Sequence, residues 1–129
     1  MKQLHFQEKY PITVVDIAKT ETRYTSAHEI AEYFKACIDE TPRVSYIASF
    51  DHLAHTLAIG GDTAPEIRAA INVVFCFGHA LPNPQVLAVR PRSIGIADMG
   101  ERFVVSFMDA PMKPANDAMQ AWTLALRNQ

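Results

Sequence analysis

The feature that most constrains the fold is the apolar run Ile71–Phe77, which ends at Gly78 and precedes a loop containing Pro82 and Pro84. Alternate residues of an extended strand point to opposite sides, and both sides of this run are largely apolar. The pattern therefore predicts a central strand that is covered on both faces. The prolines lack an amide donor, so His79 is expected where the strand meets an irregular loop. Such loops commonly hold binding residues.

Several other segments have the β-branched content or the alternation that is typical of strands. The leader Leu4–Tyr10 alternates weakly and is expected to form an edge strand or an ordered arm. Gly100 lies in a short polar segment between two apolar runs, which predicts a tight hairpin. The remaining predicted strands are Pro11–Ala18, Arg43–Phe50, Ser93–Ala97 and Phe103–Met108. Asp51–His55 is expected at a strand end or in a short turn.

Helices are predicted where a capping signal precedes apolar residues at helical spacing. Ser26 and Glu29 have the spacing of a capping box, and the helix that they begin should end before Pro42. Its buried face is expected to contain Ile30, Phe34, Cys37 and Ile38. A second main helix near the C-terminus should bury Met119, Trp122 and Leu126. Asp62 is expected to cap a short helix that runs to about Ala70.

These elements predict an α+β fold, with a mostly antiparallel sheet of about five strands and two main helices packed on one face. The 129 residues suit a single domain, 1–129. The net charge of -2 and the lack of a basic run argue against nucleic-acid binding. Neither a signal peptide nor a membrane-spanning stretch is indicated. Cys37 and Cys76 lie in apolar patterns and are expected to be reduced, buried thiols of a cytoplasmic protein.

One candidate site consists of histidines and a cysteine. His52 and His55 are three residues apart, as are Cys76 and His79. Imidazole and thiolate groups at this spacing can chelate zinc or another transition metal, and both pairs are expected near strand ends. The alternative is that Cys76 points into the core and that the histidines bond only to loop backbone. Asp51 beside His52 could instead orient that imidazole as a general base.

The other candidate site is the arginine pair in Arg90-Pro91-Arg92. Proline favours an extended conformation at Arg90, so the two side chains are expected to project to the same side. Adjacent guanidiniums repel each other unless an anion lies between them, and their geometry suits a carboxylate or a phosphate. The predicted ligand-binding residues are Arg90, Arg92 and the nearby His79. The alternative is that the arginines form salt bridges with Asp98, Glu66 or Asp109.

Four segments together resemble a family of small bacterial proteins of unknown function. They are Phe50–Thr56, Val74–Gly78, Leu81–Pro84 and Val86–Ile96. The resemblance implies a stand-alone cytoplasmic domain, and it implies no activity, cofactor or catalytic residue.

The sequence favours a small ligand-binding protein that holds an anion near Arg90 and Arg92. A first alternative is a metal-dependent or acid–base enzyme that uses Asp51, His52, His55 and His79. A second alternative is a homodimer or larger oligomer, built through an apolar strand edge or the C-terminal helix, without a catalytic site. An ion pair across such an oligomer interface would account for the arginines.

Overall fold

The computed structural model describes residues 1–78 and 80–127. Six strands form one antiparallel sheet in the order β1-β2-β6-β5-β4-β3. The strands are β1 (Lys2–Phe6), β2 (Tyr10–Ala18), β3 (Val44–Asp51), β4 (Ala69–Phe77), β5 (Arg92–Asp98) and β6 (Arg102–Met108). The helices are α1 (Ala27–Glu40), α2 (His52–Ala58) and α3 (Lys113–Leu124), with 3-10 turns η1 (Lys19–Glu21) and η2 (Pro84–Ala88). The predicted α+β class is confirmed, and β1 is the additional edge strand.

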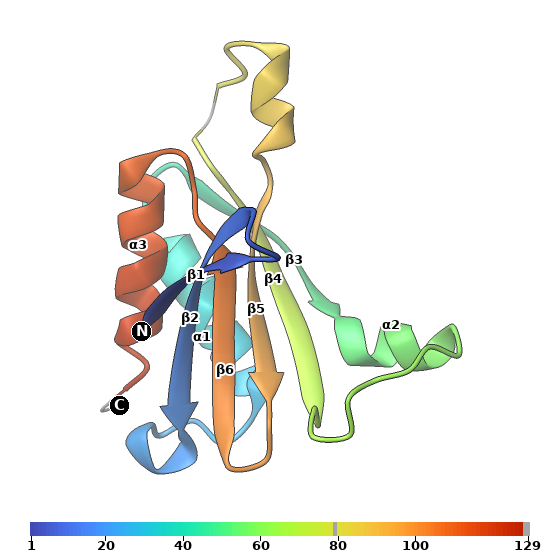
Figure 1. Ribbon diagram of the computed structural model, residues 1–129. Coiled ribbons are helices and arrows are strands. Elements are labelled where there is room, and N and C mark those ends of the chain that lie inside the picture. The colour runs from blue at the N-terminus through green and yellow to red at the C-terminus, as the bar shows by residue number, and fades with distance from the viewer. Residues whose placement is uncertain (79, 128–129) are drawn as a thin grey trace.

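Helices α1 and α3 both cover the same face of the sheet (Figure 1). The core lies between them and the strands, where Phe34 of α1 and Met119 of α3 are fully buried. Trp122 of α3 stacks on Phe77 with ring centroids 5.9 Å apart. The strand residues that fill this covered face are Val15, Ile17, Ile71, Val73, Phe75, Ile94, Ile96, Phe103, Val105 and Phe107.

The opposite side of the sheet, called here the open face, is not covered by α1 or α3. Its residues alternate with the buried ones along each strand and are half-buried or exposed. They are Ile12, Val14, Ala48, Phe50, Ala70, Asn72, Val74, Cys76, Ser93, Gly95, Ala97, Val104, Ser106 and Met108. Helix α2 and the turn η2 project beyond the sheet (Figure 1).

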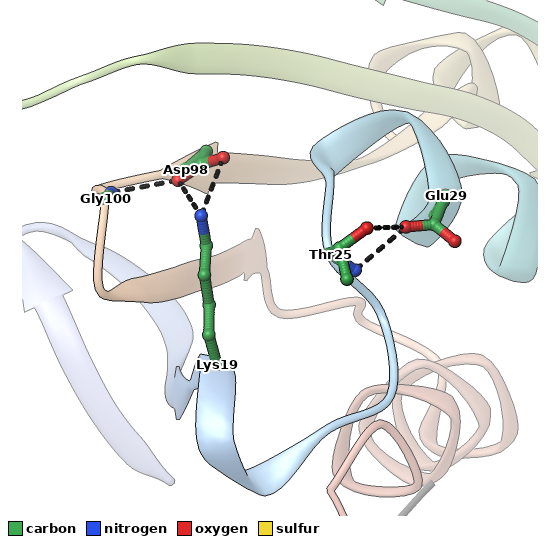
Figure 2. Close-up of polar contacts among 5 residues, drawn as sticks. All are labelled: Lys19, Thr25, Glu29, Asp98 and Gly100. Carbon is green, nitrogen blue, oxygen red and sulfur yellow. Dashed lines mark hydrogen bonds and ion pairs between the residues drawn. The ribbon is translucent and has the colours of Figure 1, made fainter.

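Local hydrogen bonds explain why the predicted helix start and hairpin form. The Ser26 side chain accepts from the Glu29 amide, as expected of an N-cap. The Glu29 carboxylate accepts from both the amide and the hydroxyl of Thr25 (Figure 2). In the β5–β6 hairpin, the Asp98 carboxylate accepts from the Gly100 amide and pairs with Lys19 at 3.0 Å (Figure 2). Gly100 has a φ of 94°, a conformation that glycine adopts without strain.

Strand β4 differs from the prediction in two respects. It is second from the sheet edge rather than central, because β3 pairs with its outer side. Only its Ile71, Val73 and Phe75 side is buried, while Asn72 and Val74 remain half-exposed on the open face. The strand was predicted to be buried on both faces because the side chains on both of its sides are mostly apolar. Among the residues that the structure describes, no second layer covers the open face.

Two other local predictions were wrong. His52–Ala58 forms the helix α2, because Asp51 caps it by accepting from the Ala54 amide at 2.9 Å. The segment after Asp62 forms a turn, and β4 already begins at Ala69, so the predicted short helix does not form. Strand β3 also contains a bulge between Tyr46 and Ala48, which leaves Ile47 54% exposed.

Candidate functional site

His52 is positioned by Asn72 rather than by Asp51. The His52 Nδ1 atom lies 2.9 Å from Asn72 Oδ1, and the Asn72 amide nitrogen donates to Ser93 Oγ at 3.1 Å. With the Asn72 oxygen accepting, His52 Nδ1 is the donor, and in the neutral imidazole Nε2 is then the acceptor. This arrangement suits a general base, while the Asp51 carboxylate is engaged in capping α2.

The predicted metal ligands do not converge within the part of the chain that the structure describes. The His52 and His55 rings are 6.5 Å apart, and the Phe50 ring lies 5.2 Å from each of them. Cys76 lies four residues beyond Asn72 on β4, with its Sγ 3.6 Å from the Phe77 carbonyl oxygen. No group of three His, Cys, Asp or Glu side chains comes together among these residues. His79 lies outside them, so the zinc site stays a prediction.

Both predicted arginines donate to backbone carbonyl groups. Arg90 Nη1 donates to the Ala80 carbonyl at 2.7 Å. Arg92 donates to the carbonyl of Val89, three residues before it, and to the carbonyl of Met108 at the end of β6. Burial lowers the pKa of Arg92, and the nearby Asp109 carboxylate partly opposes that effect. Of the predicted ion-pair partners, Asp98 pairs with Lys19 instead.

A cavity of about 580 Å³ opens where β4 ends, between the start of β3 and the first turn of α3. Its lining is mostly apolar, and its two cations are Arg43 and Lys113, the second of which also pairs with the Asp117 carboxylate at 2.8 Å. No side chain of the described residues caps the N-terminus of α3, which borders this cavity. The lining residues are Thr41, Pro42, Arg43, Val44, Phe77, Gly78, Met112, Lys113, Pro114, Ala115 and Ala118.

The backbone of the cavity wall adopts unusual conformations at two adjacent positions. Arg43 has a φ of 65° and Gly78 a φ of 84°, and the Gly78 amide donates to the Arg43 carbonyl at 2.7 Å. A left-handed conformation is costly for a residue with a Cβ, and such strain concentrates at functional sites. The Arg90 guanidinium packs closely against Gly78 in this wall. A Cβ added at position 78 would lie only 2.9 Å from Arg90 Nη2.

A family model described as "Family of unknown function (DUF6858)" matches residues 1–128. The chain belongs to this family. The predicted resemblance to proteins of unknown function is thereby confirmed. None of the curated proteins matches the chain. Among the helices of residues 1–78 and 80–127, none is long and apolar enough to cross a membrane.

Sequence reasoning missed Arg43 and Lys113. They are seventy positions apart and line the same cavity only because α3 begins beside the start of β3. The Met112-Lys113-Pro114 segment did contain a signal, since it begins a helix with proline in the first turn but lacks a capping side chain. Arg43 has no comparable signal, because its left-handed backbone depends on the bond from Gly78.

Proposed function

We propose that this protein binds a small amphipathic anion in the cavity at the end of β4. The observation that supports the proposal is the combination of apolar walls with Arg43 and Lys113 in one cavity of about 580 Å³. This volume lies in the usual range for small-molecule sites, about 300–1,000 Å³. The Phe77, Val44 and Ala118 side chains suit a hydrocarbon or aromatic body.

The acidic end of the ligand, a carboxylate or a phosphate, would lie toward Arg43, Lys113 and the first turn of α3. Free amides at a helix N-terminus attract negative charge, and charge-assisted hydrogen bonds to a guanidinium add to that attraction. In this proposal Arg90 supports the cavity through Gly78, where the sequence had suggested that it would hold the anion itself.

The test is calorimetric titration with octanoate, beside octanol and octylamine as probes of the same chain length. Octanoate should bind, and each of the other two should bind at least about tenfold more weakly because neither has a negative charge. Lys113→Ala should weaken octanoate binding several-fold, whereas Lys9→Ala, in the distant β1–β2 turn, should not. Equal binding of all three probes, or none, would exclude an anion site.

The variant Arg43→Gly tests whether the backbone strain at Arg43 and the binding of octanoate by its side chain are separate properties. The substitution should raise the free energy of unfolding by about 1 kcal/mol, because glycine accepts a positive φ, and should weaken octanoate binding. Glu8→Gly is the matched control, since Glu8 also has a positive φ of 61° but lies in the exposed turn after β1. It should stabilise the fold without changing affinity.

We propose acid–base chemistry at His52 as a second candidate function. It is favoured by the bond to Asn72, which leaves Nε2 free to accept a proton. A panel of activated carboxylic and phosphate esters, assayed with the wild type and His52→Ala, is the direct test. Equal background hydrolysis by both proteins would dismiss this candidate.

We also propose that the protein acts in a reducing compartment such as the cytoplasm. Both cysteines are free, and they lie on different elements, Cys37 on α1 and Cys76 on β4. Reduced thiols are usual in that compartment. Alkylation of lysed cells with a mass-tagged maleimide should label both thiols without prior reduction.

A further inference from the structure

The open face has the chemistry of a buried surface. Within the described residues, β3, β4 and β5 place no charged side chain on it. Its charges lie toward the other edge, where Lys2 of β1 is opposite Val14 and Asp16 of β2 pairs with Arg102 of β6. A sheet face that meets water normally alternates polar residues outward. The depletion of charge and the presence of Phe50 and Met108 are instead typical of the centre of a protein–protein interface.

Two polar residues of the open face, Asn72 and Ser93, are already paired with one another. Asn72 bonds to both His52 and Ser93 in a line that runs along the surface of the sheet. Groups that bond laterally in this way can be covered without losing a hydrogen bond to water. Their presence therefore does not oppose burial of the face.

The chain also exposes more surface than its mass predicts. Its accessible surface is 7813 Å², against about 6,800 Å² expected for a compact monomer of this mass. Part of this excess of roughly 1,000 Å² comes from the projecting α2 and η2, and the total is large enough to include the ~800 Å² that each partner contributes to a standard interface. Phe50 and Met108 on the open face are 40% and 49% exposed.

We propose that a second copy of this chain covers the open face, so that two sheets pack face to face about a two-fold axis. The part of the open face formed by β3, β4 and β5 is uncharged, so a two-fold axis through that part brings no like charges together. A recess of about 400 Å³ over Gly95 and Ser106, bordered by Met108 and Arg92, gives space for protruding side chains of the other copy. Two sheets packed in this way lie about 10 Å apart, with their side chains interdigitated.

Sedimentation equilibrium tests the proposal. The wild type should have twice the 14.4 kDa chain mass, and Val74→Lys, which places a charge within the open face, should have the mass of one chain. Ala36→Lys, on the exposed side of α1, is the matched control and should remain a dimer. Circular dichroism should show that all three proteins are folded.

A second variant keeps the test valid if Val74→Lys fails to fold. Ser106→Lys adds a charge at a half-exposed position whose side chain is not part of the core, and it should also be monomeric. A monomeric wild type at about 100 µM would overturn the proposal, and any partner of the open face would then be a different protein. A dimer that survives both lysine substitutions would overturn it as well, because the interface would then lie elsewhere. Neither outcome affects octanoate binding, since the cavity involves other residues.

Discussion

The covered face of the sheet contains Phe75, Phe103 and Ile94, whereas the open face has Asn72, Gly95 and Ser106 on the same three strands. Large side chains on the covered face fill the space beneath α1 and α3. Smaller, uncharged side chains at these positions of the open face leave a recess beside Met108. The covered face is completed by the chain itself, and the open face has the composition of one that is completed by another molecule.

This difference separates two kinds of stability. Residues of the covered face should contribute to the free energy of unfolding at any protein concentration. Residues of the open face should contribute mainly when two copies are associated, so their effects should depend on concentration. The following predictions test this division, in order of expected size.

The largest effect is expected from truncating a phenylalanine on each face. Phe75→Ala removes a fully buried ring and should lower the free energy of unfolding by about 3–5 kcal/mol. Phe50→Ala, at an exposed position, should change it by less than about 1 kcal/mol in the monomeric Val74→Lys background. Urea denaturation measures both. Similar losses for the two variants would mean that the faces do not differ as described.

A smaller effect is expected from adding a methyl group at two glycines. Gly78→Ala forces a residue with a Cβ into a φ of 84° and against Arg90, so it should cost about 1–2 kcal/mol. Gly95→Ala on the open face would meet only ordinary contacts, at 3.6 Å or more, and should be within about 0.5 kcal/mol of neutral in a monomeric background. Thermal denaturation of each alanine variant would reveal whether the ranking is reversed.

The smallest effect is expected at the start of α1, which covers the buried face. Hydrogen bonds from Thr25 lower the pKa of the Glu29 carboxyl below its usual value of 4.5. Because the folded-state pKa is depressed, the associated stability is present above the unfolded-state pKa and is lost as the pH falls through the folded-state pKa. Urea midpoints between pH 7 and pH 3 should therefore fall less steeply for Glu29→Gln than for the wild type. Glu32→Gln, also on α1 and exposed, is the control and should follow the wild type.

Those parts of the fold that depend on neighbouring residues could be predicted from the sequence. The Ser26 cap, the hairpin at Gly100 and the burial of Met119 each depend on signals within a few residues. Of the other residues predicted on the buried face of α3, Trp122 is half-buried and Leu126 is buried beyond the end of the helix. The position of β4 could not be predicted, because alternation shows which residues share a face but not whether another layer covers it. The candidate site was missed for a similar reason. Arg43 and Lys113 line the same cavity only because the folded sheet and α3 bring their segments together. Arg90 and Arg92, which the sequence singled out, donate hydrogen bonds to backbone carbonyls instead.

The bulge in β3 has a consequence for how copies of this chain can associate. β3 is an outer strand, and a regular outer strand presents unpaired amides and carbonyls that can template the addition of further strands. The irregularity at Ile47 interrupts that row, and the projecting α2 follows directly at the end of the strand. The other outer strand, β1, is only five residues long. Growth of the sheet into an open-ended fibril is thereby discouraged at both edges, whereas the proposed pairing of two open faces would close on itself.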